Sequence, residues 1–348
     1  MKKLLALLLT LAMCLCLFTA CSDSTKDTET KKDTTAETTA EEKEPVLSED
    51  PVRIFTLKGP TGMGMAKMIS DTNAKTTSLN YSFTVAGAAD EFVGDIVQGN
   101  FELAAVPTNL AATLYAKTKG EVSVVAVNTL GVLYVLENGN TINSIEDLAG
   151  KTVYSSGQGA VPEYALNYIL EAFGIECEVI YESEHDVVVS DLISGKADIA
   201  ILPEPKVTAA LKNAEAPEGL RIALDLNELW KDACEKKGDD SVFYMGCIIA
   251  NKSWADEHPA ELEAFLKEYK ASVDFVNSDE TAPQLIADAG IIPAAPVAKA
   301  ALPNSNIVCI TGNEMAKGLE GFLKVLHGYN PASVGGALPE ADFYYTGK

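Results

Sequence analysis

Two glycine-containing loops carry residue types that could bind a small polar or anionic molecule. Each follows an apolar run, "VRIFTL" in one case and "KTVYSS" in the other, and each precedes a stretch typical of a helix. The candidate contacts in the first loop are Gly59, Pro60, Thr61, Gly62 and Met63. Those in the second loop are Ser155, Ser156, Gly157, Gln158 and Gly159. Glycine lets a ligand approach the main chain closely, and N–H groups at a helix start favour an electron-rich guest. We expect ligand-binding loops; the alternative is a pair of tight turns.

Neither loop has the pattern of a nucleotide site. The first lacks GxxxxGK[ST], and its "GPTGMG" is not GxGxxG. The second, "GQGAVPE", begins like a dinucleotide fingerprint but has a proline near the third glycine position. No acidic residue in a suitable context follows at the distance that ribose recognition requires. Nucleotide binding is therefore not expected.

Two proline-containing turns, at residues 107–109 and 203–205, add further polar groups. Thr108 and Asn109 supply neutral donors and acceptors in the first turn. Glu204 in the second could accept a hydrogen bond from an amine or a ring N–H. It could equally be a favourable charge at a helix start. The nearest cations are Lys58 and Lys206.

Several of these residues have a simpler structural explanation. Thr61 and Ser156 could cap helices. Met63 and Tyr244 could form apolar walls of a binding site, because ligand pockets are mostly apolar with few polar anchors. Met63 could instead belong to the core. The four loops as a set are thus a stronger prediction than any one residue.

The cysteines and histidines form no recognisable metal or catalytic pattern. The cysteines beyond Cys21 are widely spaced and lack a CxxC pair: Cys177, Cys234, Cys247 and Cys309. Both disulfides and buried free thiols stay open for them. The histidines have no ligand-like spacing and none falls in the loops above: His185, His258 and His327. We expect no metal, no cofactor and no Ser/His/Asp or Cys/His catalytic set.

An internal repeat indicates the elements that position the loops. "GNFELAAVPTNLAATL" (99–114) matches "GKADIAILPEPKVTAAL" (195–211), and "DEFVGDIVQG" and "DVVVSDLISG" precede them in register. Each unit is typical of a helix, a glycine turn, a short buried strand and a proline that opens the next helix. Strands alternating with helices indicate an α/β fold with two similar lobes and mainly parallel sheets. Such sheets bind ligands beyond the carboxyl ends of their strands.

The first fifty residues indicate the compartment. Lys2 and Lys3 precede an apolar run over residues 4–17, which is typical of a secretory signal over residues 1–20. The run ends in "LFTAC", which resembles the lipobox of bacterial lipoproteins, with Cys21 as the lipidated residue; the alternative is an ordinary signal with an incidental cysteine. Residues 21–50 are rich in Ser, Thr, Asp, Glu and Lys, a composition that predicts a disordered linker. Such a linker spans about 30 Å.

Size and charge limit the possible roles of the chain beyond the linker. About 300 residues remain, more than one compact core usually holds, so two lobes are expected. The net charge of −23 argues against nucleic acid and anionic membrane surfaces as partners. The only arginines are Arg53 and Arg221, which limits bidentate recognition of a carboxylate or phosphate.

Together these features resemble the solute-binding lipoproteins of ABC importers, in the group that binds nitrate, sulfonates, taurine and thiamine precursors. "INSIEDLAGKTVYSSGQGAVPEYALNYILEAFGI" resembles the segment that opens the second lobe in that group. "MGCIIANKSWADEHPAELEAFLKEYKASVDFVN" resembles its return strand and long helix. The resemblance covers residues 52–345 and implies a type II periplasmic-binding-protein fold, whose two lobes close on a solute.

In such proteins the chain crosses twice between the lobes. The matching crossings here would lie near residues 136–143 and 241–246. The first lobe would then comprise residues 51–140 plus 245–348, and the second lobe residues 141–244. The hinge is expected at residues 138–141 and 244–246.

The resemblance also implies a function. It implies a lipid-anchored monomer on the extracytoplasmic face of the cell membrane, which captures a small polar organic solute and delivers it to the permease and ATPase subunits of an ABC importer. Two alternatives stay open: an enzyme of the same fold with lyase-like chemistry, and a sensory or adhesive lipoprotein without a transport role. The solute could be a sulfonate-like anion or an amine-bearing heterocycle.

Overall fold

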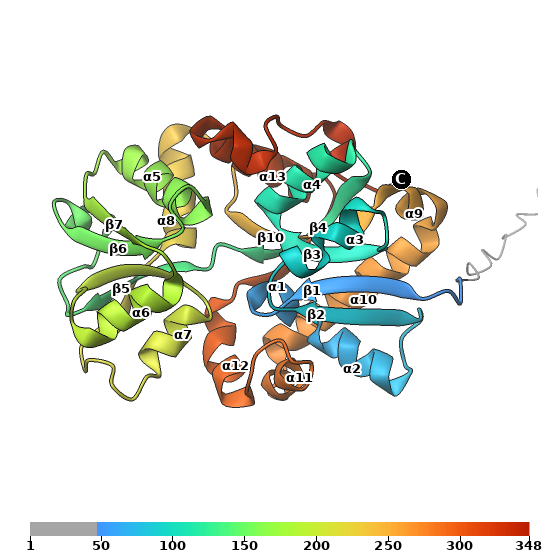
Figure 1. Cartoon of the computed structure of the whole chain (residues 1–348), viewed down its shortest axis with the longest axis horizontal. Helices are drawn as coiled ribbons and strands as arrows, with labels where there is room; N and C mark the ends of the chain where they lie inside the picture. The colour runs from blue at the N-terminus through green and yellow to red at the C-terminus, as the bar shows by residue number, and fades with distance from the viewer. Residues whose placement is uncertain (1–46, 348) are drawn as a thin grey trace, which may run out of the picture. The chain divides into compact units, whose positions relative to one another are not determined.

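The computed structural model describes residues 47–347 (Figure 1). The signal sequence, Cys21 and most of the linker lie outside these residues, so the predictions made for them stay predictions. Among residues 47–347, no helix is both long and apolar enough to cross a membrane.

Within residues 47–347, eleven strands form two sheets, and each sheet combines parallel and antiparallel neighbours. In spatial order, the six-stranded sheet contains β11 (Ile307–Ile310), β4 (Val122–Leu130), β10 (Tyr244–Asn251), β3 (Leu103–Pro107), β1 (Val52–Leu57) and β2 (Tyr81–Ala86). The five-stranded sheet contains β7 (Glu178–Glu182), β6 (Thr152–Ser156), β8 (Ile199–Pro203), β5 (Leu133–Asn138) and β9 (Leu220–Asp225). We call the parts of the chain built on these sheets the first and second lobe.

The α/β fold with two lobes is confirmed, but the sheets are mixed rather than mainly parallel. β2, β1 and β3 run parallel to one another, and so do β7, β6 and β8. β10 pairs antiparallel with β3, and β5 pairs antiparallel with β8. The reason is that β5 and β10 are the strands by which the chain enters one lobe from the other, so they run opposite to the strands of the βα units.

The internal repeat predicted from the sequence is a repeat of structure. Gly99 and Gly195 end equivalent helices with positive φ, at 77° and 74°, a conformation that glycine adopts without steric cost. β3 and β8 follow, each between a parallel neighbour and an antiparallel return strand. The units differ after the strand, because α4 (Thr108–Thr118) begins directly after Pro107 whereas α7 (Lys206–Leu211) begins three residues after Pro203.

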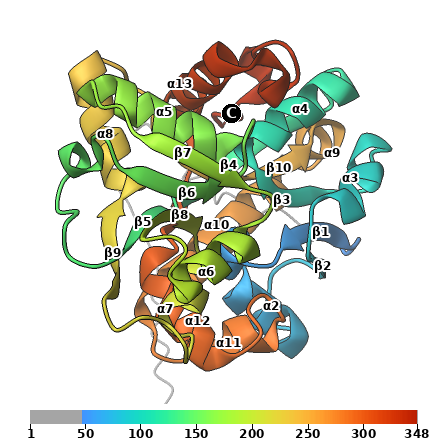
Figure 2. The ribbon, with the colours of Figure 1, turned by 60° about the vertical axis from the view of Figure 1, so that its left-hand side comes forward.

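Side chains alternate between the two faces of each sheet along the strands, and both faces are buried. Along β3, Leu103 and Ala105 belong to one core cluster, and Ala104 and Val106 belong to another, as expected from the twofold periodicity of a strand. Helices cover both faces, as Figures 1 and 2 show. The helices that contribute side chains to the cluster with Leu103 and Ala105 are α1 (Pro60–Met63), α2 (Ala66–Ala74), α9 (Lys252–Glu257), α10 (Pro259–Ser278), α11 (Ala282–Asp288) and α12 (Ala295–Ala301).

The second cluster continues from one lobe into the other. It receives side chains from α3 (Asp90–Val97), α4, α5 (Val161–Phe173), α8 (Leu226–Lys237), α13 (Gly312–Tyr329) and the 3₁₀ helices η1 (Ile145–Leu148), η3 (Pro331–Val334) and η4 (Ala341–Phe343). A smaller cluster under α6 (His185–Ser194) and α7 covers the other face of the second sheet.

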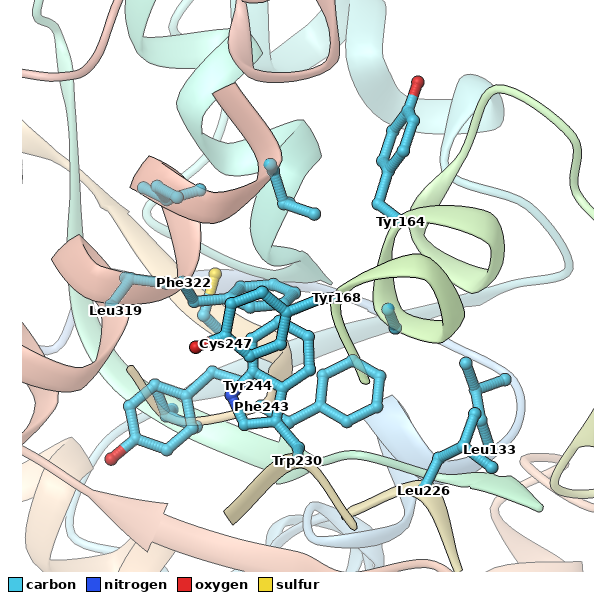
Figure 3. Packing of buried hydrophobic residues seen from close by; sticks show 14 of the residues in the cluster. Leu133, Tyr164, Tyr168, Leu226, Trp230, Phe243, Tyr244, Cys247, Leu319 and Phe322 are labelled. Atoms are coloured by element: carbon cyan, nitrogen blue, oxygen red, sulfur yellow. The ribbon is translucent and has the colours of Figure 1, made fainter. Parts of the chain in front are cut away.

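An aromatic group joins the lobes within the second cluster (Figure 3). The Trp230 ring stacks on Tyr168 at 4.3 Å between centroids and on Phe243 at 4.9 Å. Its edge meets Phe322 of α13 at 5.5 Å. Tyr168 and Trp230 lie on helices of the second lobe, and Phe322 lies on a helix that packs against β4 and β10 of the first. The interior at which these elements of the two lobes meet is therefore apolar and closely packed.

The chain crosses between the sheets at two places. The first crossing is residues 131–132, between β4 and β5. It comes before the range 136–143 expected from the sequence, because the apolar run 133–138 is a strand of the second sheet and the turn is made at Gly131. The second crossing is residues 238–243, between α8 and β10, and it overlaps the expected range 241–246.

Candidate functional site

The carboxyl ends of the parallel strands in the two sheets point toward each other (Figure 1). The loops after β1 and β8 meet there, since a Cβ built on Gly59 would lie 3.8 Å from Cδ of Pro205. All four loops predicted from the sequence follow parallel strands of this edge, after β1, β3, β6 and β8. The strand topology therefore brings the predicted loops to one region between the lobes.

The first loop is shaped by packing against its own lobe. Gly59 has φ +86°, and its N–H donates to the Ile291 carbonyl at 3.1 Å. Pro60 opens α1, which is a single turn. A Cβ on Gly62 would lie 2.0 Å from the Leu57 carbonyl oxygen. The close approach that Gly62 allows is thus the approach of α1 to the end of β1.

Thr61 and Met63, on the same turn, point to different surroundings. Met63 is fully buried in the core of the first lobe. The Thr61 side chain is half-buried and makes no hydrogen bond within the described chain, while its carbonyl accepts from Nδ2 of Asn128 at 3.1 Å. Asn128 lies on β4 and is 1% exposed. Sequence reasoning missed Asn128, because nothing in an apolar strand marks the residue that holds a loop 67 positions away.

The turn after β3 divides between core and surface. The Thr108 hydroxyl donates to the Tyr244 carbonyl at 2.6 Å, and Thr108 is 1% exposed. The Tyr244 ring is also buried and packs against Gly318 of α13. Burial raises the pKa of Tyr244 to about 12. Asn109 is half-buried, and its side chain makes no hydrogen bond within residues 47–347.

The loop after β6 has a buried start and an exposed tip. Ser155 and Ser156 are each 2% exposed. Gly157 and Gly159 adopt positive φ, at 79° and 73°, and they flank the exposed Gln158. The loop is held to α5 by two bonds: the Gly159 N–H donates to Oε2 of Glu163, and the Tyr164 hydroxyl donates to the Gly159 carbonyl.

A histidine joins this loop, contrary to expectation. Nδ1 of His185, the first residue of α6, hydrogen-bonds with the Ser156 hydroxyl. Burial lowers the pKa of His185, and the charge of Lys206 lowers it further. Lys206 itself pairs with Asp186 at 2.5 Å. The signal that could have found His185 is its position after β7, the third parallel strand of the second sheet.

Glu204 is 3% exposed, and its carboxylate accepts three hydrogen bonds from the protein. Oε1 accepts from the Thr208 hydroxyl at 3.0 Å and from Nδ2 of Asn304 at 3.2 Å. Oε2 accepts from the Thr208 N–H at 3.2 Å. Burial raises the pKa of Glu204, and these hydrogen bonds oppose the rise. Glu204 thus caps the start of α7 and contacts the first lobe.

Cations at this edge come from lysine, not arginine. Arg53 is bidentate to Glu102, and Arg221 pairs with Glu137 at 2.7 Å. Both arginines lie toward the opposite ends of their strands. Lys58 is exposed and has no ion pair among the described residues. A hollow of about 700 Å³, lined in part by Glu137, Lys151 and Lys196, lies at the far edge of the second sheet and does not include the predicted loops.

Metal ligands are not assembled in the described part of the chain. Within residues 47–347, no group of three His, Cys, Asp or Glu side chains could hold a metal ion. The cysteines that remained open are free thiols there: Cys177, Cys234, Cys247 and Cys309.

Comparison with known proteins agrees with the fold described above. Residues 113–281 match the family model described as NMT1/THI5 like. Among solved structures, an ABC transporter protein from Parabacteroides distasonis is 22% identical, with a TM-score of 0.69, over 84% of this chain and 98% of that one. The periplasmic aliphatic sulphonate binding protein SsuA from Escherichia coli is 16% identical, with a TM-score of 0.66, over 86% and 94%. The chain has the type II periplasmic-binding-protein fold.

A third structure extends the same likeness. The alkanesulfonate-binding protein SsuA from Xanthomonas axonopodis pv. citri, bound to MOPS, is 12% identical, with a TM-score of 0.56, over 85% of this chain and 96% of that one. Comparison with curated protein sequences finds no match. The resemblance to this group of binding proteins, first seen in the sequence, is confirmed.

Proposed function

We propose that the protein is the solute-binding component of an ABC importer, anchored by a lipid on Cys21 to the extracytoplasmic face of the membrane and acting as a monomer. The observation that carries the proposal is that four strand-end loops, two from each lobe, follow parallel strands whose carboxyl ends face the other lobe, with Gly59 beside Pro205. Open α/β sheets bind ligands beyond the carboxyl ends of their strands. Two observations support delivery to permease and ATPase subunits: the fold, and the description of one structural neighbour as an ABC transporter protein.

The solute contacts are proposed from the four loops. Three side chains there are at least partly exposed and make no hydrogen bond with the described protein: Thr61, Asn109 and Gln158. Neutral hydroxyl and amide groups both donate and accept hydrogen bonds. Together with loop N–H groups they suit a small polar organic solute held without a metal.

The engagement of Glu204 favours one class of solute. Glu204 is the carboxylate of the four loops that could accept hydrogen bonds from an amine, but it is buried and both of its oxygens already accept from Thr208 or Asn304. Lys58 is the exposed cation beside the first loop and has no ion pair within residues 47–347. We therefore favour a sulfonate-like anion over an amine-bearing heterocycle.

The Ser156–His185 pair does not favour the enzyme alternative. A serine nucleophile must be accessible to its substrate and needs a base that a third group orients. Ser156 is 2% exposed, and the neighbouring carboxylate of Asp186 pairs with Lys206. We propose that His185 positions the Ser156 end of β6 rather than performing catalysis.

A thermal-shift screen of the purified protein tests the proposal. The panel contains alkanesulfonates, nitrate, amino-pyrimidines and neutral amides, because a solute that binds only the folded state raises the melting temperature. We expect an alkanesulfonate to raise it, and Lys58→Gln to weaken that effect. A response to amino-pyrimidines alone contradicts the solute class. Conversion of a stabilising solute into product contradicts the transport role.

A further inference from the structure

A short segment of the first lobe is hydrogen-bonded to the second lobe. The 3₁₀ helix η2 (Leu302–Asn304) lies between α12 and β11, so it belongs to the first lobe, which is built on the six-stranded sheet. Its last residue, Asn304, nevertheless bonds twice to the five-stranded sheet and its loops. The Tyr134 hydroxyl of β5 donates to the Asn304 carbonyl at 2.8 Å, and Nδ2 of Asn304 donates to Glu204 at 3.2 Å.

Both partners of Asn304 are buried. Tyr134 and Glu204 are each 3% exposed. A hydrogen bond to a buried carboxylate is stronger than a neutral one, and a buried polar group that loses its partner is costly. Thr208 makes the other two hydrogen bonds to the Glu204 carboxylate. These bonds lie within the second lobe, so they can hold the carboxylate in place without Asn304.

The same segment also holds the first crossing. Nδ2 of Asn306 donates to the Gly131 carbonyl at 2.5 Å. The Leu130 N–H donates to the Asn306 carbonyl at 3.1 Å. Asn306 therefore contacts the first crossing at Gly131, whereas Asn304 contacts residues of the second lobe. When the lobes separate, the contacts of Asn304 must break, together with the bond from Nδ2 of Asn306 to the Tyr134 hydroxyl at 3.5 Å.

We propose that residues 302–306 form a latch that keeps the lobes of this protein together in the absence of solute. In this latch, Asn304 of the first lobe is hydrogen-bonded to Tyr134 and Glu204 of the second lobe. Nearby contacts support the same closed arrangement: α12 packs against α7, and Gly59 lies beside Pro205. Breaking the latch shifts the population of the solute-free protein toward separated lobes.

Small-angle X-ray scattering of the solute-free protein tests the latch. Asn304→Ala removes the bond to Glu204, and Tyr134→Phe removes the bond to the Asn304 carbonyl. We expect each variant to shift the radius of gyration to a larger value than that of the unaltered protein, and the double variant to shift it furthest.

Two matched controls separate a latch from a general effect of lost hydrogen bonds. Asn277→Ala removes an amide donor to the Ile307 carbonyl, and Tyr115→Phe removes a hydroxyl donor to Asp342; both bonds lie within the first lobe. We expect neither control to change the radius of gyration. The latch is overturned if Tyr134→Phe and Asn304→Ala scatter like the unaltered protein, or if the controls expand equally. Should Asn304→Ala not fold, as judged by circular dichroism, Tyr134→Phe alone decides.

Discussion

Gly131 lies directly against the ring of Phe243. A Cβ built on Gly131 would be 2.3 Å from Cδ1 of Phe243 and 2.9 Å from Cε1. The first crossing between the sheets contains Gly131, and the second contains Phe243, so the two crossings touch where the chain passes between the lobes. The Gly131 N–H donates to Oδ1 of Asn227 at 3.3 Å, and the Val132 N–H donates to Sδ of Met245. The hinge is thus a packed and hydrogen-bonded unit.

Gly131→Ala should destabilise the protein. The methyl group has no space, and Phe243 cannot move aside because it stacks on Trp230. Overpacking of this kind costs about 1–3 kcal/mol. Urea denaturation measures the loss. Gly328→Ala is the control, since its Cβ meets nothing within 4 Å on a helical site, and it should be neutral or stabilising. Equal stability of the two variants would contradict the packed hinge.

Gly62→Ala should reduce stability whether or not solute is present. Its Cβ would lie 2.0 Å from the backbone oxygen of Leu57, and backbone atoms cannot rotate away as a side chain does. We expect a lower melting temperature in the solute-free protein. The control is Gly94→Ala, whose nearest neighbour is the end of the flexible Gln98 side chain at 4.0 Å. A Gly62→Ala protein that melts normally but fails to bind solute would instead make Gly62 a ligand contact.

Glu204→Gln should alter the pH dependence of stability. The pKa of Glu204 is raised by burial, so the folded state holds this proton more tightly than the unfolded state does. Its contribution to stability is therefore greatest at low pH and is lost as the pH rises through the raised pKa. Relative to the unaltered protein, Glu204→Gln should become more stable as the pH increases from about 4 to 8. A stability difference that does not depend on pH argues against this assignment. Denaturation at several pH values measures it.

Trp230 should report movement of the lobes. It is fully buried and contacts rings from α5, the second crossing and α13. Because Trp254 is the only other tryptophan, Trp254→Phe leaves Trp230 as the sole indole fluorophore. We expect blue-shifted emission that changes when a stabilising solute is added, together with a smaller radius of gyration. The change in radius should be larger in Asn304→Ala, whose lobes start further apart. In the unaltered protein the latch already holds the lobes together, so the changes there should be small. Unchanged emission and scattering of Asn304→Ala at saturation would argue against hinge closure about residues 131–132 and 238–243.

Cys21→Ser should release the protein from the membrane. The lipid is attached through the cysteine sulfur in lipoproteins of the kind that "LFTAC" resembles. We expect the variant in the medium or periplasm and the unaltered protein in the membrane fraction. Immunoblots of the separated fractions measure this distribution. Ser22→Ala is the control, because it changes the neighbouring position and keeps the thiol. A Cys21→Ser protein that stays membrane-bound means that another element anchors it.

Local patterns in the sequence were sufficient to predict the α/β class, the repeat and the four loops. Each depends on neighbours along the chain: an apolar strand, a turn residue and a helix. The match between residues 99–114 and 195–211 was informative because two copies of one unit place their loops at equivalent strand ends. The second crossing, residues 238–243, overlaps the range 241–246 that the family resemblance implied.

The rest of the site depends on residues that are distant in sequence. Asn304 and Glu204 are 100 positions apart, and Ser156 and His185 are 29 apart. An asparagine or histidine that forms such a bond has no local signature, since the partner is chosen by the fold. The first crossing comes before the range that the family resemblance implied, because residues 133–138 form a strand of the second sheet. Gly131 interrupts an apolar run, and only the ring of Phe243 explains why a glycine is needed there.

The strand order makes the two lobes unequal during synthesis. All five strands of the second sheet come from one uninterrupted stretch, residues 133–225, and can pair as soon as that stretch is available. The first sheet cannot, because β10 lies between β4 and β3 and is made only after the entire second lobe. Until about residue 251 has emerged, β3 and β4 each lack the neighbour that joins them. The lobe that begins first along the chain is therefore completed last, and its unpaired strands are the part of the nascent protein most in need of protection from aggregation.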